Sequence, residues 1–301
     1  MQNIVLHSSW YFCVAGYKLF AYKSNTEMEY NMDPILAKIK KVINESEHIV
    51  VISGLEVVLE AGLNGVRAEQ IAYDIEQEYG YSNDEIISSE FFSRRVDAFY
   101  KYYREVILNK EAKPTTVHQK IFEIQQAGRL DGVVTRTVYS LHKQAGCENV
   151  VELHGSVEEN RCPNCNKAYG SEYIRSAKGV PTCDVCGIPL RPGFTLIGEM
   201  VDNGKMTKAS NAVENADVLL IVGAGLNSTL CRHLLKYYSG NKMIVLNVRE
   251  SIGDDKADYQ AYGNLSEMMT AITEGLEPVK RKAEKKTDKT EKKEENKKDD
   301  E

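Results

Sequence analysis

Residues 150–187 read VVELHGSVEENRCPNCNKAYGSEYIRSAKGVPTCDVCG and hold four of the seven cysteines of the chain. These four cysteines form two C-x-x-C pairs: Cys162 with Cys165, and Cys183 with Cys186. A two-residue gap lets a tight turn direct both thiolates to one point, and two such turns supply the four ligands of a tetrahedral Zn²⁺ site. Because four thiolates leave no open coordination position, the pattern predicts a structural zinc and not a catalytic one.

The alternative for the same cysteines is a pair of disulfides, which requires an oxidising compartment and a secretion signal. The apolar pieces of residues 1–30 are interrupted by Gly16 and Lys18, and no basic region precedes them, so we do not expect a signal peptide. The other cysteines are scattered and odd in number, which fits a reducing, cytoplasmic setting in which they are small buried apolar residues. They are Cys13, Cys147 and Cys231.

The overall composition describes a globular chain with an acidic balance. Of 301 residues, 42% are hydrophobic, and the formal net charge is −6. This length allows one large domain and a small one. The negative charge argues against nucleic-acid binding as the main purpose. No apolar run approaches the roughly 20 residues of a membrane span, so we expect no membrane partner.

Composition also divides the chain into segments. We expect residues 1–30 to be a poorly ordered leader and residues 31–276 to form the main domain, with the zinc module inserted at about residues 157–193. Residues 277–301 consist almost wholly of Lys, Glu, Asp, Thr and Asn, so this tail cannot bury an apolar face and is expected to be disordered. An interaction arm is the other interpretation of the tail.

Short apolar runs alternate with helical patterns along the main domain. Residues 49–52, 217–222 and 243–248 are almost wholly apolar, and the first two enter glycine turns. Such runs are typical of buried parallel strands, and a glycine turn after one is where nucleotide-binding α/β folds place their phosphate loop. Residues 130–135 and 149–153 are further short strands. The pattern predicts an α/β fold with a Rossmann-like parallel sheet and helices on both faces.

Helices are expected between these strands. Asp33 followed by Pro34 is an N-cap signal for a helix that reaches about residue 44. Further helices are expected over residues 68–79 and 84–108, and another opens at Pro114. The 84–108 segment carries a broad aromatic face, which is more often core than a ligand-binding surface.

The sequence Leu153-His154-Gly155-Ser156, directly ahead of the four-cysteine ribbon, resembles the sirtuins, which are NAD-dependent protein lysine deacylases. The resemblance spans roughly residues 33–273. It implies NAD as a cofactor and an acyl-lysine peptide or protein as a partner. It also implies that a peptide would lie as an added strand between the sheet and the zinc module.

In sirtuins the acyl-lysine carbonyl oxygen attacks the nicotinamide ribose as nicotinamide leaves, and a histidine then acts as a general base on a ribose hydroxyl. His154 is the residue that would carry this role, and a neutral imidazole suits it because its unperturbed pKa lies near neutrality. The positions that would contact the nucleotide by resemblance are Gly54, Glu56, Arg67, Thr135, Arg136, Gly223, Gly225 and Asn247.

Two stretches depart from the sirtuin pattern. Glu56 stands where the family has a glycine that lets backbone N–H groups approach a pyrophosphate. A carboxylate 4 Å from a phosphate charge is repelled by about 1 kcal/mol in water and by ~4 kcal/mol at an effective dielectric of 20. In the second stretch, the Gln, Asn and Asp of the family's ribose- and nicotinamide-binding run are replaced by Arg136, Thr137 and Tyr139.

These departures leave three classes of function open. The chain is an NAD-dependent deacylase or a relative that transfers ADP-ribose, a catalytically silent sensor of a nucleotide or peptide, or, least favoured, a zinc-ribbon interaction module. A separate hypothesis is based on Arg136. A guanidinium in the former nicotinamide pocket suits a carboxylate or phosphate better than a neutral amide, which would favour ADP-ribose or another phosphorylated nucleotide over NAD.

Overall fold

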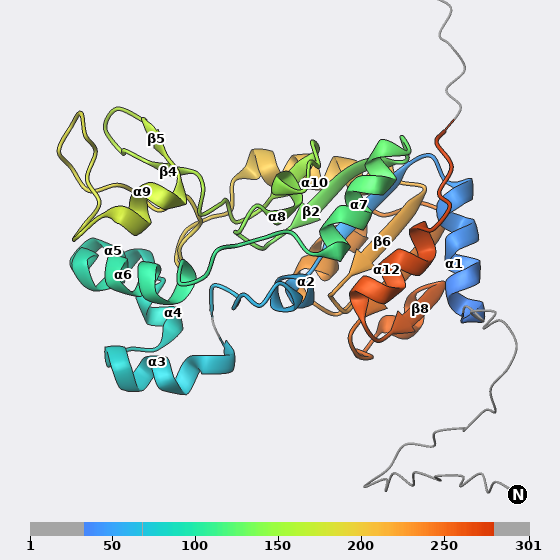
Figure 1. Ribbon diagram of the computed structural model, residues 1–301, viewed down its shortest axis with the longest axis horizontal. Coiled ribbons are helices and arrows are strands. Elements are labelled where there is room, and N and C mark those ends of the chain that lie inside the picture. Colours follow the sequence, from blue (N-terminus) through green and yellow to red (C-terminus); the bar gives the residue numbers. More distant parts are fainter. Residues whose placement is uncertain (1–32, 68, 280–301) are drawn as a thin grey trace, which may run out of the picture. The chain divides into compact units, whose positions relative to one another are not determined.

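A six-stranded sheet forms the centre of the fold in the computed structural model, which describes residues 33–67 and 69–279 (Figure 1). Its strands are β1 (Ile49–Ser53), β2 (Leu130–Thr135), β3 (Val150–Glu152), β6 (Val218–Val222), β7 (Lys242–Asn247) and β8 (Tyr259–Tyr262). All neighbouring strands are parallel and lie in the order β3-β2-β1-β6-β7-β8. This is the Rossmann strand order, with the direction of winding reversing between β1 and β6. The predicted α/β fold is confirmed.

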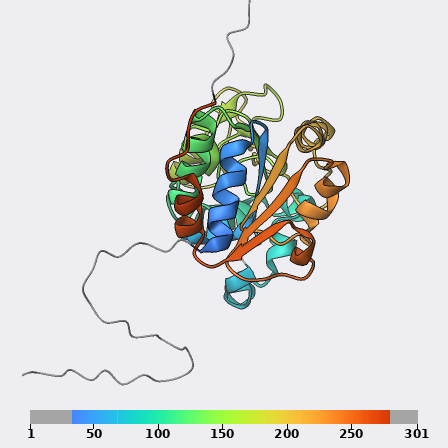
Figure 2. The same ribbon diagram turned by 90° about the vertical axis from the view of Figure 1, so that its right-hand side faces the viewer.

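Strand β1 shows why both faces of the sheet are covered. All five of its residues are buried. Ile49 and Val51 belong to one hydrophobic cluster, which also contains residues of α1 (Pro34–Glu45), α7 (Thr116–Gln126) and α12 (Leu265–Thr273). Val50 and Ile52 point to the other face and pack with α10 (Asn203–Glu214) and α11 (Thr229–Leu234). Successive side chains of a strand point to opposite faces, so a continuous apolar run requires helices on both (Figure 2).

Local signals account for the ends of several helices. Helix α1 begins at Pro34, and the Asp33 side chain accepts a hydrogen bond from the Ile35 backbone N–H at 2.8 Å, as predicted. Helix α7 is closed at its start by a reciprocal pair of hydrogen bonds between Thr115 and His118. The remaining helical segments on the sheet side are α2 (Leu55–Glu60), α8 (Leu141–Gln144), η3 (Leu235–Tyr237) and η4 (Asp254–Lys256).

The prediction of one helix over residues 84–108 is wrong. The region divides into α4 (Asn83–Ile86), α5 (Ser89–Arg94), α6 (Val96–Tyr102) and the π-helical turn η2 (Tyr103–Ile107). The first break has a tertiary cause: the Ser89 backbone N–H donates to the Ile197 carbonyl, and the Ile197 N–H donates to the Ile87 carbonyl. Ser88 then caps the new helix through the Phe91 N–H. Ahead of α4, the helix predicted over residues 68–79 starts later, with the 3₁₀ turn η1 (Glu69–Ile71) leading into α3 (Ala72–Tyr79).

The aromatic face of these helices is core, as predicted. Phe99, Tyr100 and Tyr103 are fully buried, and they belong to one cluster with residues of the cysteine-containing insertion. The Tyr100 hydroxyl donates to the Leu190 carbonyl at 2.6 Å, and the Tyr103 hydroxyl donates to Asn160 Oδ1 at 3.1 Å. The insertion itself contains β4 (Asn160–Arg161), β5 (Ala168–Tyr169) and α9 (Ser171–Ser176), with β4 and β5 antiparallel.

The insertion leaves and rejoins the main domain through two neighbouring chain segments. Gly155 and Phe194 form an isolated antiparallel bridge, and the Ser156 N–H donates to the Gly193 carbonyl at 3.0 Å. A Cβ atom on Gly155 would lie 2.2 Å from the Gly193 carbonyl oxygen, so this close crossing requires glycine.

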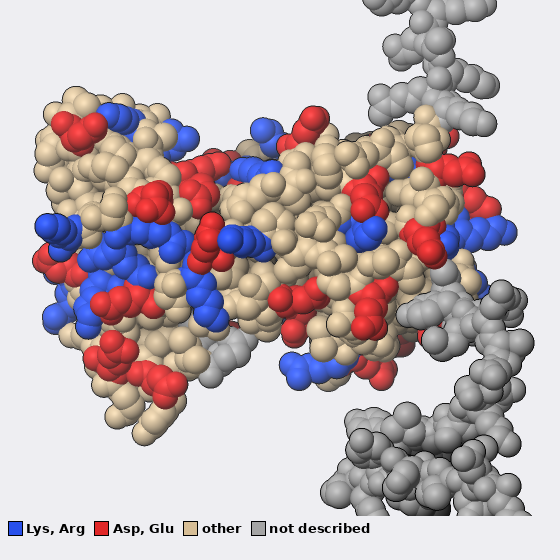
Figure 3. All heavy atoms as spheres, viewed as in Figure 1, with Lys and Arg blue, Asp and Glu red and all other residues tan. Residues whose placement is uncertain are grey.

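Acidic and basic side chains alternate over the face seen in Figure 3. Among the described residues, no helix combines the length and the apolar content needed to cross a membrane. The expectations for residues 1–30 and for the tail beyond residue 279 lie outside the described part of the chain.

Candidate nucleotide and zinc sites

Two glycine turns meet at the carboxyl ends of β1 and β6, where the winding of the sheet reverses. Gly54 follows β1, and its N–H donates to the Val222 carbonyl at 2.8 Å. A Cβ atom on Gly54 would lie 2.2 Å from the carbonyl oxygen of Gly223. Gly223 follows β6 and has a φ of +69°, in the left-handed region. Ligands of open α/β sheets bind in the crevice at this reversal, so the backbone here fits a nucleotide-binding site.

Two further predicted positions lie along the same edge of the sheet. Gly225 packs against Ser251, since a Cβ atom on this glycine would lie 2.5 Å from the serine Cβ. Asn247 ends β7 and is buried, with its side-chain oxygen accepting the Val248 N–H at 2.9 Å. The ends of β6 and β7 therefore bring Gly223, Gly225 and Asn247 to one edge, as the fold predicts for a nucleotide site.

Asp254 organises this edge and was not predicted from the sequence. It is fully buried, and its Oδ1 accepts the Leu226 N–H at 2.8 Å while its Oδ2 accepts the Ser251 N–H at 3.0 Å. The first bond joins the loop after β6 to the loop after β7, and the second lies within the loop after β7. A buried carboxylate is stable only where donors satisfy it. Asp254 stands in a short run of Gly and Asp that reads as an ordinary loop, so no sequence signal distinguishes it.

Glu56 lies in the first turn of α2, directly after the Gly54 turn. Its side chain is partly buried, and its backbone N–H donates to the Gly223 carbonyl at 3.1 Å. A carboxylate is favoured in the first turn of a helix by the partial positive charge of the free N–H groups. Glu56 thus brings to the glycine turns a negative charge of the same sign as a phosphate.

Arg67 is exposed and lies in the segment between α2 and η1. Its Nε atom is 3.5 Å from Asp84 Oδ1, and its carbonyl accepts a hydrogen bond from the Asn83 side chain. Ion pairs between side chains this exposed contribute little to stability, so Asp84 does not hold Arg67 tightly in one position.

Thr135 ends β2, where it pairs with Ser53 at the end of β1, and Arg136 follows it. The Thr135 hydroxyl donates to the Ser53 carbonyl at 3.0 Å and accepts the Thr137 N–H at 3.1 Å, so its buried oxygen is satisfied within the protein. Arg136 turns toward the residues after β3, and its Nε–H donates to His154 Nε2 at 2.8 Å. The structure therefore brings the predicted base and the unusual arginine into direct contact.

His154 is uncharged at neutral pH. Burial, followed by the positive charges of Arg136, Arg67 and Lys205, lowers the pKa of His154 to about 4. Since Nε2 accepts the hydrogen bond from Arg136, the proton of the neutral ring lies on Nδ1, which is buried and has no hydrogen-bond partner among the described residues. Lys205, in the first turn of α10, was not predicted; nothing in its local sequence connects it with His154.

The four cysteines of the insertion lie together as predicted. Their Sγ atoms are all within 4.8 Å of one another, and those of Cys165 and Cys183 are 3.6 Å apart. Zn–S bonds of about 2.3 Å in a tetrahedron separate the sulfur atoms by about 3.8 Å, so the cluster fits a Zn(Cys)₄ site.

Each cysteine pair sits in a tight turn that directs its sulfur atoms inward. The Asn166 N–H donates to the Cys162 carbonyl at 3.0 Å, and the Gly187 N–H donates to the Cys183 carbonyl at 2.8 Å. Asn166 and Gly187 both have positive φ, which these residue types tolerate best. Backbone N–H groups in both turns also donate to cysteine sulfur atoms. Cys147 and Cys231 are buried elsewhere, as predicted, and Cys13 lies outside the described residues.

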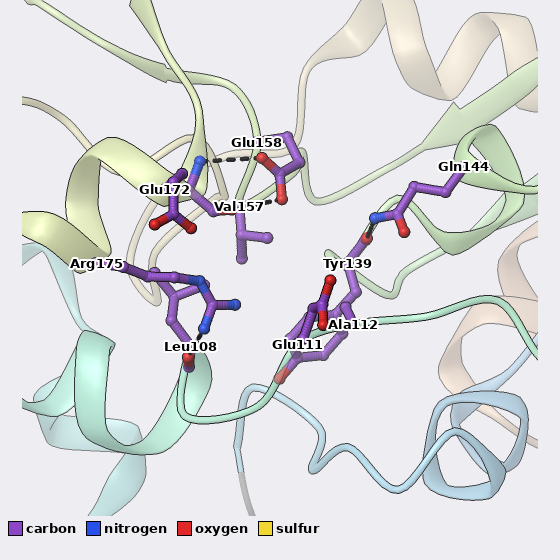
Figure 4. Close-up of a pocket in the computed structure, with 10 residues that line it drawn as sticks. Leu108, Glu111, Ala112, Tyr139, Gln144, Val157, Glu158, Glu172 and Arg175 are labelled. Atoms are coloured by element: carbon purple, nitrogen blue, oxygen red, sulfur yellow. Dashed lines mark hydrogen bonds between the residues drawn. The ribbon is translucent and has the colours of Figure 1, made fainter.

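A separate cavity of about 220 Å³ lies where the insertion meets the chain around η2 and α8 (Figure 4). The Arg175 guanidinium donates to the Leu108 and Lys110 carbonyls at its wall, and Glu158 accepts from the Ser171 N–H at 3.0 Å. The residues around it include none of the predicted site residues. The cavity is therefore distinct from the site at the glycine turns.

Comparisons with known proteins agree with this fold. A sequence model of the Sir2 family matches residues 54–229. The NAD-dependent protein deacetylase of Clostridium tetani is 33% identical over 239 residues, which cover 79% of this chain and 97% of the relative. The chain belongs to the Sir2 family, the sirtuins.

Solved structures of sirtuins have the same fold. A Sir2 homolog in complex with NAD is similar with a TM-score of 0.67 and 26% identity, covering 85% of this chain and 98% of that one. A structure of Sir2 bound to an acetylated peptide has a TM-score of 0.67 and 25% identity, covering 79% and 97%.

Proposed function

We propose that the protein is an NAD-dependent protein lysine deacylase whose activity is reduced or altered by its own side chains. The observation that carries the proposal is the neutral imidazole of His154, which follows β3 at the same carboxyl edge of the Rossmann-like sheet as the glycine turns. The relative from Clostridium tetani is named for NAD and for protein deacetylation, and solved relatives hold NAD or an acetylated peptide. NAD, when bound, would supply the ribose that accepts the acyl group.

The residues that would hold NAD divide into backbone and side-chain contributions. The turns at Gly54 and Gly223 would let the chain approach the nucleotide closely, with Gly225 and Asn247 beside them. Thr135 would present its backbone and Arg67 its guanidinium. Glu56 would oppose the phosphates, so we expect weaker NAD binding than a glycine at this position would give.

His154 would act as the general base through Nε2, the nitrogen that carries no proton. That nitrogen accepts the Arg136 Nε–H, so the bond must break before Nε2 can take a proton from a hydroxyl group. The low pKa of His154 also makes it a weak base at neutral pH. Both effects reduce turnover without abolishing it.

The same contact favours a second candidate function. A histidine whose basic nitrogen is bound to a guanidinium suits a catalytically silent protein that senses a nucleotide or an acylated peptide. In that case Arg136 and Glu56 affect the affinity for the ligand and take no part in a reaction. ADP-ribose would then bind at least as tightly as NAD, which calorimetric titration with both ligands measures.

The release of nicotinamide from NAD with an acetyl-lysine peptide distinguishes the two functions. For the deacylase we expect slow steady-state release by the zinc-loaded protein. Over many turnovers His154→Ala should lose about 100-fold or more, because the intermediate formed as nicotinamide leaves needs the general base to go on to product. His233→Ala is a matched control, since this exposed histidine lies on α11. No release from the unmodified chain would refute the deacylase and support the sensor.

A further inference from the structure

The Arg136 guanidinium has further donor groups besides the one that it gives to His154. Its Nε–H is bound to His154, but its two terminal Nη groups have no acceptor among residues 33–67 and 69–279. The side chain is partly exposed, so these groups remain accessible. Within the same described residues, Arg136 forms no ion pair with a carboxylate. A guanidinium whose fork is free and accessible matches the geometry of an oxyanion, which it can hold through two parallel hydrogen bonds.

The surroundings of Arg136 add positive charge. Burial, and then the charge of Arg67, lowers the pKa of Arg136. The charges of Arg67 and Lys205 also lower the pKa of His154, so all three cations act on that imidazole. Among these, Arg67 has an acidic partner, Asp84, at 3.5 Å. Like charges held together repel one another, and a bound anion relieves that repulsion.

We propose that Arg136 is the oxyanion-binding residue of a ligand site beside His154, and that the group bound is a carboxylate or a phosphate. The Nη groups hold the oxyanion while the Nε–H stays on His154. While this bond is intact, His154 is a positioning residue for Arg136, and it can serve as a base only after the bond breaks. Its Nε2 atom fixes the plane of the guanidinium and therefore the direction of the fork.

The location of this site limits where the oxyanion comes from. The inference rests on the proposed function for that location, since the acyl chain and the nucleotide would meet at His154. The oxyanion is therefore either a carboxylate at the end of the acyl group on lysine or a phosphate of the nucleotide. Binding without turnover tests the inference, so its failure is distinct from failure of the deacylase.

The first measurement compares two peptides by fluorescence anisotropy with the zinc-loaded full chain. One carries succinyl-lysine, and the other carries the neutral succinamyl-lysine of the same size. We expect the succinyl peptide to bind about tenfold more tightly, as for one charge-assisted pair of hydrogen bonds. Arg136→Gln should remove this difference and leave the affinity for the neutral peptide unchanged. Arg94→Gln is the matched control, because this exposed arginine lies on α5 away from the cleft.

A second arm measures ADP-ribose binding by calorimetry. If the peptides bind alike but Arg136→Gln weakens ADP-ribose binding about tenfold, the oxyanion is a phosphate. The proposal is overturned if neither ligand responds to Arg136→Gln, or if the preference for the succinyl peptide persists in that variant. Arg136→Lys keeps the positive charge but lacks the paired Nη donors, and it replaces Arg136→Gln if that variant does not fold. An unchanged preference of Arg136→Lys for the succinyl peptide would contradict a role for the paired donors.

The positioning role of His154 has its own readouts. His154→Ala should reduce the preference for the charged ligand several-fold, and His154→Gln should restore part of it through its side-chain acceptor. The ¹⁵N resonance of His154 Nε2 should report an acceptor in the unmodified chain and change in Arg136→Gln, while His48, exposed near Asp131, stays constant. Equal preference in His154→Ala and the unmodified chain would exclude the positioning role.

Discussion

Asp254 gives the sharpest prediction for a single residue. Asp254→Ala leaves the buried N–H groups of Leu226 and Ser251 without their acceptors. Each unsatisfied buried donor costs about 1–3 kcal/mol, so we expect the free energy of unfolding to fall by about 3 kcal/mol. Urea unfolding followed by circular dichroism measures this loss.

The neighbouring acid provides the control for that experiment. Asp255 is exposed, and Asp255→Ala should change the free energy of unfolding by about 0.5 kcal/mol or less. Asp254→Asn, which keeps one acceptor, should lie between the two. Equal stabilities of Asp254→Ala and Asp255→Ala would mean that the two loops do not depend on this carboxylate.

Some site residues can be predicted from the sequence because their type and spacing already imply the chemistry. The C-x-x-C pairs place four thiolates at one point whatever surrounds them. The Arg136 contact with His154 could not be predicted, because it depends on how the loop after β2 turns toward β3. The charge of Lys205, on α10, acts on His154 from far along the chain, which no local pattern reveals.

The structure of the cysteine-containing insertion should depend on its bound zinc. Strands β4 and β5 contain two residues each, and a two-stranded hairpin is marginal in water. We expect one zinc ion per chain and, after chelation, four newly reactive thiols, while most of the far-UV circular dichroism of the main sheet is retained. Metal analysis and a thiol-reactive dye measure these quantities.

Two variants separate ligation from general destabilisation. Cys162→Ser should lose stoichiometric zinc, whereas Cys147→Ser, which changes a buried cysteine outside the cluster, should keep it. Four thiols that react at full rate before chelation would contradict the predicted site.

Helices and strands could be predicted where the local sequence, and not a distant contact, determines the structure. The wholly buried strands β1 and β6 are of this kind. Strand β8 was missed because it is partly exposed at the sheet edge and its sequence, YQAY, has no continuous apolar run. The break at Ser88 was missed because it is imposed by Ile197, more than a hundred residues away in the sequence.

The whole molecule should lose stability in mild acid. Burial lowers the pKa of His118 to about 4 and that of His142 well below its usual value. Their folded-state pKa values are below the unfolded ones, so the unfolded chain binds more protons between about pH 6.5 and pH 4, and stability falls as the pH falls through this window. For His118 the full effect is roughly 3 kcal/mol.

Urea midpoints of the zinc-loaded chain between about pH 7.5 and pH 5 measure this slope. His142→Leu should flatten it, because both ring nitrogens of His142 are buried without hydrogen-bond partners among the described residues. His48 is exposed, and its pKa is raised mainly by its hydrogen bond to Asp131, so His48→Gln should leave the slope unchanged or steeper. If His142→Leu does not alter the change of the urea midpoint with pH, His142 is not a source of the acid sensitivity.

The packing of Gly54 against Gly223 has an evolutionary consequence. A side chain at Gly54 would collide with the Gly223 carbonyl, and one at Gly223 would meet Val57 from a left-handed backbone. Neither position can be replaced while the other turn stays where it is. Heritable change is therefore easier at side chains near these turns than at the two glycines, so a descendant can exchange Glu56 or Arg136 and keep the same backbone.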